Sequence, residues 1–309
     1  MQHPRIIFMG TPEFAVASLE ALLKAGLDIA AVVTAPDKPA GRGMKITESA
    51  VKKFAAGKGL KILQPEKLKD PLFLETLGSM RADLQIVVAF RMLPESVWNM
   101  PPMGTINLHG SLLPQYRGAA PINWAVINGE TETGVTTFKL QQDIDTGDIL
   151  MQESYPIGED ETAGEVLEGI KYIGAGLLVK TIKGLTDGTL NKTPQSLISH
   201  ADSLKPAPKI IPETCKINWD QPITKIYNLV RGLSPSPGAY TFFDGKMLKI
   251  FKSKKEEITP AASPGNFETD KKTFLKFAAA DGYIYAEEIQ LEGKKKMPVG
   301  DFLRGYRLK

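Results

Sequence analysis

Residues 105–121 read TINLHGSLLPQYRGAAP, and this stretch decides the fold that the rest of the chain is expected to adopt. Its first five residues are predicted to form a strand, in which successive side chains point to opposite faces. Asn107 and His109 would then lie on one face, and Leu108 would turn toward a core on the other. Polar side chains at a strand end in an α/β sheet point into the crevice that binds ligands. The alternative is that both residues merely bond to nearby loop backbone.

Apolar strands alternate with amphipathic helices on the N-terminal side of this stretch. Short apolar runs indicate buried strands at residues 5–10, 28–34, 60–63 and 83–90. Apolar residues at helical spacing predict helices at residues 11–25, 47–57, within 65–80, and at 94–99. This alternation predicts a doubly wound, Rossmann-like α/β domain.

The same pattern continues on the C-terminal side. A helix is expected at 119–128, and strands at 134–140 and 148–155 flank the polar segment 141–147. A long amphipathic helix is expected at 162–184, because Thr162 and Glu165 have the spacing of a capping box.

Two loops carry information about ligands. The turn after the first strand lacks the second and third glycines of a GxGxxG fingerprint, which argues against a dinucleotide cofactor. The loop 35–45 contains two prolines, two glycines and the cations Lys38, Arg42 and Lys45. We expect it to be mobile, since it can bury little apolar surface to offset its ordering entropy. Such a loop is either an ordinary surface loop or a functional one.

A second, smaller domain is expected at the C-terminal end. The segment 194–212 is rich in Pro, Ser and Lys, which is typical of a linker. A helix at 222–231 and short strands at 240–243, 247–252, 273–278 and 283–291 follow it. This pattern predicts a small, OB-like β-barrel. The predicted division is therefore a catalytic domain at 1–193, a linker at 194–212 and a barrel at 213–309.

Composition narrows the class of protein. The chain has 309 residues, of which 42% are hydrophobic and 24% charged, as in ordinary globular proteins. No apolar run approaches the ~20 residues of a membrane helix, and the N-terminus does not resemble a signal peptide. We expect a cytoplasmic, monomeric protein without membrane association. A metal site is not expected, because the single Cys215 and three scattered histidines offer no ligand cluster.

Charge is distributed unevenly along the chain. Residues 1–199 contain 19 Lys and Arg against 22 Asp and Glu, whereas residues 200–309 contain 19 against 13. Clustered cations favour polyanionic partners through release of phosphate counterions. The excess predicts either such a partner or a solvated lysine-rich surface.

Several motifs together resemble the formyltransferases that use 10-formyltetrahydrofolate. The shared motifs are NLHGSLLP at 107–114, YRGAAP at 116–121 and DTGDIL at 145–150. Further segments resemble the branch of this family that acts on methionyl-tRNA, and they extend the resemblance over nearly the whole chain. These segments are FMGTPEF at 8–14, PDKPAGRG at 36–43, GKKKM at 293–297 and DFLRG at 301–305.

The resemblance implies a role for specific residues of this chain. Asn107, His109 and Asp145 correspond to the family's catalytic residues. The implied folate contacts are Phe90, Leu93, Ser111, Leu112, Leu113, Pro114 and Asp143. The implied tRNA contacts are Lys38, Arg42, Lys45 and Lys209. The chain departs from the family at Ala89-Phe90-Arg91, where a glycine is usual, and in the segment 209–214, which has one lysine fewer.

The implied reaction moves a formyl group from 10-formyltetrahydrofolate to the α-amine of methionine on initiator methionyl-tRNA. An α-amine has a pKa of roughly 7.7–8.0, and a neighbouring ester lowers it, so the amine needs no strong base before it attacks. Asn107 and a protonated His109 would donate to the oxyanion of the tetrahedral intermediate, and Asp145 would hold the imidazolium or relay a proton. Direct attack by the amine also makes Ser111 and Cys215 unnecessary as covalent nucleophiles.

Other functions remain open at the level of sequence. An amino-sugar nucleotide formyltransferase would share the catalytic core and a similar second domain. A glycinamide ribonucleotide formyltransferase would share the core but generally lacks that domain. A non-catalytic RNA-binding protein is disfavoured, because Asn107, His109 and Asp145 are all present.

Overall fold

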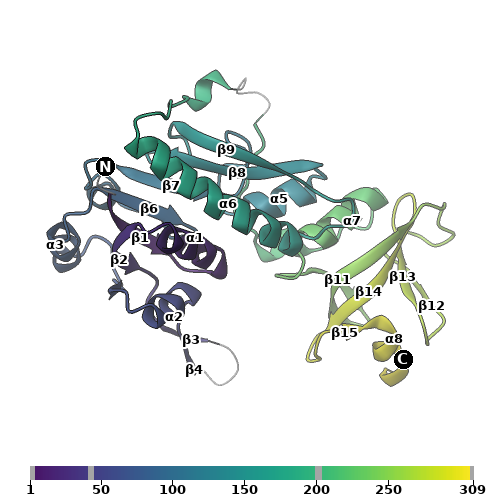
Figure 1. Ribbon diagram of the computed structural model, residues 1–309. Helices are drawn as coiled ribbons and strands as arrows, with labels where there is room; N and C mark the ends of the chain where they lie inside the picture. Colours follow the sequence, from purple (N-terminus) through teal and green to yellow (C-terminus); the bar gives the residue numbers. More distant parts are fainter. Residues whose placement is uncertain (1–3, 41–44, 199–203, 307–309) are drawn as a thin grey trace. The chain divides into compact units, whose positions relative to one another are not determined.

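The computed structural model describes residues 4–40, 45–198 and 204–306 (Figure 1). The chain divides into two compact units, and each unit combines separate segments. The N-terminal unit consists of Met1–Arg117, Gly134–Tyr155 and Glu168–Pro206, and the C-terminal unit consists of Gly118–Thr133, Pro156–Leu167 and Ala207–Lys309. Within the described residues, none of the helices combines the length and the apolar character needed to cross a membrane.

A seven-stranded sheet forms the centre of the N-terminal unit. Its strands are β1 (Arg5–Gly10), β2 (Asp28–Val33), β5 (Ile62–Leu63), β6 (Leu84–Val88), β7 (Thr105–His109), β8 (Glu132–Lys139) and β9 (Ile149–Pro156). The strand order is β5-β2-β1-β6-β7-β8-β9, with parallel pairing from β5 to β7 and antiparallel pairing of β7 with β8. The order reverses direction between β1 and β6, which is where doubly wound sheets bind ligands.

Helices cover both faces of this sheet, as expected for a doubly wound fold. They are α1 (Glu13–Lys24), α2 (Ala50–Gly57), α3 (Pro71–Ser79), α4 (Glu95–Trp98) and α6 (Ala163–Thr186). On one face, Ile7 and Met9 of β1 pack with Phe73 and Leu77 of α3. On the other face, Figure 1 shows α1 and α6 lying across the strands. The predicted Rossmann-like class is confirmed.

The loop 35–45 contains more regular structure than the sequence indicated. Its flanks form β3 (Lys38–Ala40) and β4 (Lys45–Thr47), which pair as an antiparallel two-stranded sheet. The sequence did not predict these two short strands. Three-residue strands carry too little periodicity to be recognised from sequence. The tip, including Arg42, lies outside the described residues.

The start of α6 confirms the predicted capping box. The Thr162 backbone N–H and hydroxyl both donate to Glu165 Oε2, at 2.8 and 2.7 Å. In return, the Glu165 N–H donates to Thr162 Oγ1 at 3.3 Å. These hydrogen bonds lower the pKa of Glu165, first through the backbone N–H and then through the hydroxyl of Thr162. The reciprocal pair fixes where the helix begins.

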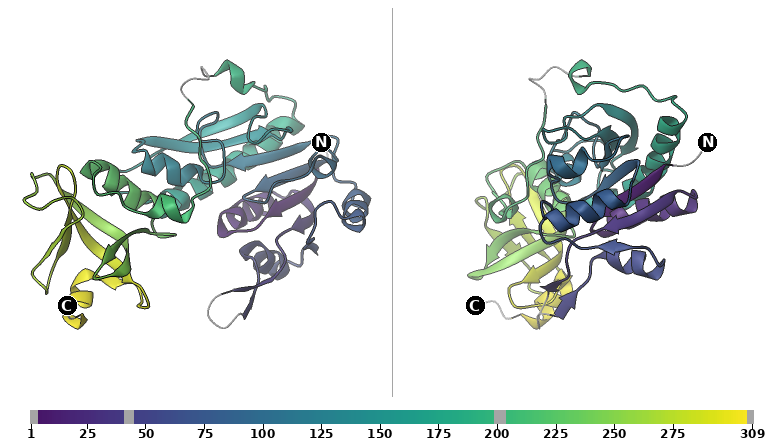
Figure 2. Two further views of the ribbon diagram at one scale, coloured as in Figure 1. Left: turned by 180° about the vertical axis from the view of Figure 1, so that it is seen from behind. Right: turned by 90° about the vertical axis from the view of Figure 1, so that its left-hand side faces the viewer.

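The C-terminal unit contains two helices that pack together and an antiparallel half-barrel. Asn123 of α5 (Pro121–Ile127) donates to the Gly232 carbonyl at the end of α7 (Ile223–Gly232), at 2.7 Å. The strands are β10 (Ala239–Phe243), β11 (Lys246–Glu256), β12 (Phe267–Thr269), β13 (Leu275–Ala278), β14 (Tyr283–Leu291) and β15 (Met297–Pro298). Their order is β10-β11-β14-β13-β12, with β15 paired to β14. Figures 1 and 2 show these strands curving around a common interior.

Aromatic side chains fill the half-barrel. Trp219 stacks on Phe277 with ring centroids 4.9 Å apart. Phe243 of β10 meets Phe267 of β12 at 4.8 Å, so the two end strands approach each other through their rings. Phe302 of α8 (Val299–Gly305) joins the same core. The predicted OB-like class is confirmed, although β12, β15 and α8 were not expected from the sequence.

Candidate active site

The strand β7 separates polar from apolar side chains as the alternation predicted. A Cβ added to Gly174 of α6 would lie 3.0 Å from Leu108 Cδ2, so Leu108 faces this helix and is packed tightly beneath it. Asn107 and His109 therefore point to the opposite face. There, Asn107 is paired in register with Phe138 of β8.

His109 is almost completely buried, with 7% of its surface exposed. Its Nε2 lies 2.9 Å from the Tyr116 carbonyl oxygen. Because a carbonyl can only accept, Nε2 carries the proton and donates. The other ring nitrogen, Nδ1, faces Asp145 Oδ2 at 3.8 Å. The edge of the ring packs on Phe138, with centroids 6.4 Å apart. Backbone and aromatic contacts thus fix the ring and leave Nδ1 turned toward the carboxylate.

Asp145 reaches His109 through an unusual backbone conformation. Its φ is +54°, in the left-handed region that aspartate tolerates better than most residues. Two residues later, a Cβ at Gly147 would lie 1.7 Å from the Lys139 carbonyl oxygen, so only glycine fits. The Asp-Thr-Gly segment therefore packs directly on the end of β8, and Asp145 is buried with 9% of its surface exposed.

Asn107 presents an unused amide beside this pair. Its side chain is half-buried. It makes no hydrogen bond to any residue in the part of the chain that the structure describes. A half-buried amide with free donors and a free acceptor is suited to bind a polar ligand. The fold thus places Asn107 and His109 on one strand face and brings Asp145 to His109 from a distant loop.

The turn after β7 is held by internal hydrogen bonds. Ser111 is completely buried, and its hydroxyl donates to the Gln115 carbonyl at 2.7 Å. The Leu113 N–H donates to Thr136 Oγ1 at 3.1 Å, and Gln152 donates to the Leu113 carbonyl at 2.9 Å. These bonds hold the turn rigid. Among the predicted folate contacts within it, Ser111, Leu113 and Pro114 are buried and Leu112 is half-buried.

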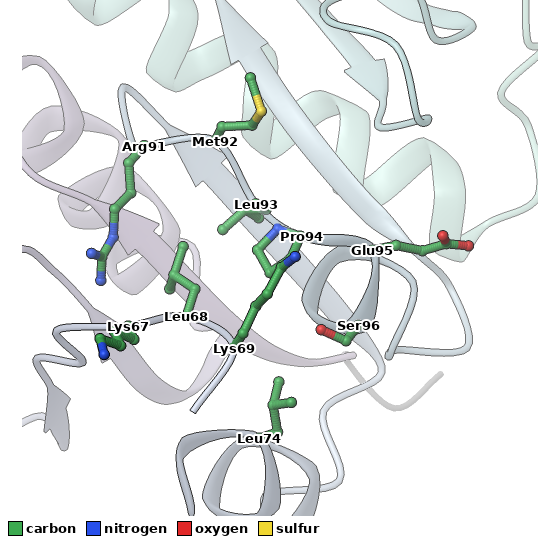
Figure 3. A pocket seen from close by; sticks show the side chains of 10 residues that line it. All are labelled: Lys67, Leu68, Lys69, Leu74, Arg91, Met92, Leu93, Pro94, Glu95 and Ser96. Carbon is green, nitrogen blue, oxygen red and sulfur yellow. The ribbon is translucent and has the colours of Figure 1, made fainter. Parts of the chain in front are cut away.

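The remaining predicted folate contacts lie on two other loops. Phe90 and Leu93 are half-buried after β6, and Asp143 is exposed in the loop before Asp145. Leu93 also lines an open cavity of about 780 Å³. Figure 3 shows Lys67, Lys69 and Arg91 extending around this cavity. Neither His109 nor Asp145 is among the residues that line it.

The predicted tRNA contacts are divided between the two compact units, with Lys38 and Lys45 in the N-terminal unit and Lys209 in the C-terminal unit. Lys38 is exposed on β3, and Lys209 is exposed in the segment before the half-barrel. The backbone of Lys45 belongs to β4. Arg42 lies outside the described residues.

Sequence reasoning missed the contribution of Gln195. This residue was expected in the linker, but its side chain is buried, with 4% exposed. It donates to the carbonyl oxygens of Asp145 and Gly147, each at 2.8 Å. No signal in a single sequence connects a glutamine in a polar segment with a loop about fifty residues earlier.

Comparison with known proteins gives matches over most of the chain. The family model described as formyl transferase matches residues 4–182, and the model of the formyl transferase C-terminal domain matches residues 209–307. A methionyl-tRNA formyltransferase of Bacteroides fragilis is 48% identical over 309 residues, covering 98% of this chain and 95% of that protein.

Two solved structures share the fold. HypX from Aquifex aeolicus, in complex with tetrahydrofolic acid, has a TM-score of 0.68 at 18% identity and covers 98% of this chain and 48% of its own. An N-formyltransferase from Helicobacter canadensis, in complex with folinic acid and dTDP-3-aminofucose, has a TM-score of 0.66 at 20% identity. The match covers 95% of this chain and 100% of that chain. At these identities, the similarity establishes the fold alone.

Proposed function

The chain belongs to the formyl transferase family, and on this premise we propose that it formylates the α-amine of methionine on initiator methionyl-tRNA. The donor in this proposal is 10-formyltetrahydrofolate. The observation that carries it is a full-length relative of 48% identity that is named methionyl-tRNA formyltransferase. In this proposal, Asn107, His109 and Asp145 carry out the chemistry of the reaction. We propose that the enzyme works in the cytoplasm as a monomer.

The first step is attack of the neutral α-amine on the formyl carbon. The nitrogen lone pair forms the new C–N bond, and the electrons of the C=O bond move to oxygen. Preorganised donors aimed at this oxyanion stabilise the transition state, and removal of one such donor typically costs roughly 10²–10³ in rate. In our proposal, the Asn107 amide donates to the oxyanion, since its donors are not used by the described protein groups.

His109 and Asp145 act together in the same step. The Nε2–H of His109 is held by the Tyr116 carbonyl, so Nδ1 is the nitrogen available to the substrate. The separation of 3.8 Å between Nδ1 and Asp145 Oδ2 exceeds a direct hydrogen bond. A proton on Nδ1 can therefore serve the substrate oxygen, while Coulomb attraction to the carboxylate stabilises the imidazolium.

The intermediate collapses by breaking the bond between the formyl carbon and N10 of the folate. The electrons of that bond stay on N10, which takes up a proton. The attacking nitrogen releases one proton, so the reaction balances without an external acid or base. Asp145 lies next to the imidazole and can relay this proton through water. The products are N-formylmethionyl-tRNA and tetrahydrofolate.

The assignment of substrates completes the proposal. The folate would lie along the carboxyl ends of the strands, with Phe90, Leu93, Ser111, Leu112, Leu113, Pro114 and Asp143 at its site. Lys38, Arg42, Lys45 and Lys209 would contact the tRNA. We also propose that the catalytic domain ends at residue 193 and that the linker to the barrel ends at residue 212. An amino-sugar nucleotide acceptor is less supported, because the full-length relative at 48% identity carries the methionyl-tRNA name.

A parallel assay of three acceptors tests the proposal. The full chain is given 10-formyltetrahydrofolate together with initiator methionyl-tRNA, glycinamide ribonucleotide or an amino-sugar nucleotide. We expect the kcat/KM for formyl transfer to be higher with methionyl-tRNA than with either of the other acceptors. A higher kcat/KM for either of the other acceptors would overturn the assignment. The formyl group is transferred to the α-amine of methionine, and uncharged tRNA lacks this amine. Uncharged tRNA therefore serves as the blank.

A further inference from the structure

We propose that Gln195 is a positioning residue for the reaction, which holds the Asp145 loop in place and is itself oriented by Arg117. This inference rests on the proposed function of Asp145 and extends it to two residues with no assigned role. Gln195 begins the short 3-10 helix η1 (Gln195–Leu197), within the segment that the sequence indicated to be a linker. All four residues concerned, Gln195, Arg117, Asp145 and Gly147, belong to the N-terminal unit.

The orientation of the Gln195 amide follows from its partners. Arg117 donates to Oε1 through Nε at 3.0 Å and through Nη2 at 2.6 Å. A guanidinium can only donate, so the atom that it faces must be the oxygen. On the other side, Nε2 faces the carbonyl oxygens of Asp145 and Gly147, which can only accept. Both assignments agree, and the amide has one orientation.

The side chain of Gln195 uses its full hydrogen-bonding capacity. Its two N–H donors go to two carbonyls, and its oxygen accepts from two N–H groups. Only 4% of its surface is exposed, so water does not compete for these bonds. A buried amide whose donors and acceptor are all hydrogen-bonded is held in one geometry. Neither glutamate nor methionine could donate as Gln195 does.

The Gln195 side chain adds to the close approach of Gly147 to β8 in holding this loop. Residues 141–144 are exposed, whereas Asp145 and Gly147 are buried. Asp145 has a left-handed backbone, and this conformation costs energy unless its surroundings enforce it. Thr193 pairs with Ile149 through two backbone hydrogen bonds of 2.9 Å, which bring Gln195 alongside the loop. Gln195 then binds the backbone on both sides of Thr146.

The consequence for catalysis is geometric. The Asp145 carboxylate lies 3.8 Å from His109 Nδ1, and the same residue's carbonyl is held by Gln195. A displacement of about 1 Å in a catalytic group can cost on the order of 10² in rate. Loss of the Gln195 amide should therefore reduce the chemical step while leaving substrate binding intact.

The test replaces Gln195 by methionine, which keeps the length of the side chain and removes the amide. We expect kcat for formyl transfer to methionyl-tRNA to fall at least ~10-fold, with KM for both substrates within about 2-fold of wild type. The matched control is Gln290→Met, since Gln290 donates to the Lys294 carbonyl in a solvent-exposed hydrogen bond. Gln195→Glu, which keeps the acceptor for Arg117 but cannot donate, should be no more active than Gln195→Met. Recovery of wild-type kcat by Gln195→Glu would overturn the proposal.

A double-mutant cycle separates positioning of Asp145 from general support of the fold. In an Asp145→Asn background, Gln195→Met should cause less than about 2-fold further loss, because residues that act as one unit are not additive. A full additional loss would contradict the proposal.

Amide hydrogen exchange gives a readout that does not depend on the substrate. In Gln195→Met, exchange in a peptide covering residues 141–148 should become faster, and in Gln290→Met it should not change. Unchanged exchange in Gln195→Met would refute the role of Gln195. If the wild-type enzyme did not formylate methionyl-tRNA, the proposed acceptor would be refuted. Faster exchange in Gln195→Met would in that case still support the positioning role of Gln195.

Discussion

Gly147 illustrates at the scale of one residue how the absence of a side chain lets a loop bring a carboxylate close to an imidazole. The backbone of the loop passes so close to β8 that a Cβ would meet the Lys139 carbonyl at 1.7 Å. Asp145 is carried toward His109 by this close approach. In the Asp-Thr-Gly motif, Gly147 therefore allows the close approach to β8, and Asp145 supplies the carboxylate that this approach brings near the imidazole.

We predict that Gly147→Ala lowers kcat by at least ~10-fold, because the loop must move away from β8 and Asp145 moves with it. The control is Gly176→Ala, since no atom lies within 4 Å of a Cβ at this position in α6. Steady-state formyl transfer of the two variants checks the prediction. Equal activity of both variants would show that the close approach is not needed.

Sequence reasoning reached some residues of the site and not others. The alternation of β7 placed Asn107 and His109 on one face, and packing of Leu108 against α6 confirms this arrangement. Asp145 entered only through the family resemblance, because no local pattern links it to a strand nearly forty residues earlier. Gln195 was missed altogether, since its role depends on a tertiary contact with the Asp145 loop.

At the scale of elements, the strands and helices with clear periodicity were predicted well, and α6 shows why. Thr162 and Glu165 form a reciprocal cap that is encoded entirely in four consecutive residues. By contrast, β3, β4, β12 and β15 have two or three residues each. Their pairing partners, rather than their own sequence, determine that they are strands.

We predict that Thr162→Ala destabilises the protein by about 1 kcal/mol, as is usual for loss of a helix N-cap. Urea or thermal unfolding at neutral pH measures this change. A value indistinguishable from wild type would mean that packing alone fixes the start of α6.

The cap also predicts a dependence on pH. The pKa of Glu165 is lowered in the folded protein, chiefly by the Thr162 N–H and then by its hydroxyl. A lowered folded pKa stabilises the protein above the unfolded pKa of about 4.3, and this stabilisation is lost as the pH falls through the folded value. The stability difference between wild type and Glu165→Gln should therefore be present at neutral pH and shrink below about pH 4.

At the scale of the whole molecule, we propose that the excess of cations in residues 200–309 serves to bind the tRNA. This region carries 19 Lys and Arg against 13 Asp and Glu. The class of each domain could be predicted from the order of strands and helices. The division into units could not, because Gly118–Thr133 and Pro156–Leu167 belong to the C-terminal unit through contacts that are distant in sequence.

We predict that the affinity for tRNA falls steeply with salt. Each phosphate contact made by Lys or Arg should contribute about 0.7–0.9 to the slope of log K against log salt. Binding of the full chain to initiator tRNA across a salt series measures the slope. A flat plot would exclude an electrostatic role for the basic region.

Arg42→Ala should weaken tRNA-dependent kinetics and leave folate binding unchanged. The guanidinium can contact a phosphate or a base edge with two hydrogen bonds, and alanine cannot replace it. The expected result is a higher KM for methionyl-tRNA with the same dissociation constant for the folate. Parallel loss of both affinities would indicate a structural role for the loop.

The central claim is that Asn107 and His109 stabilise one tetrahedral intermediate, and a single-turnover rate measures this most directly. Enzyme saturated with 10-formyltetrahydrofolate is mixed with a lesser amount of methionyl-tRNA, and formyl transfer is followed for wild type, Asn107→Ala and His109→Ala. We predict that each variant transfers at least ~10² more slowly than wild type, while it remains folded and its folate affinity is unchanged. A transfer rate equal to that of wild type in either folded variant would contradict the account.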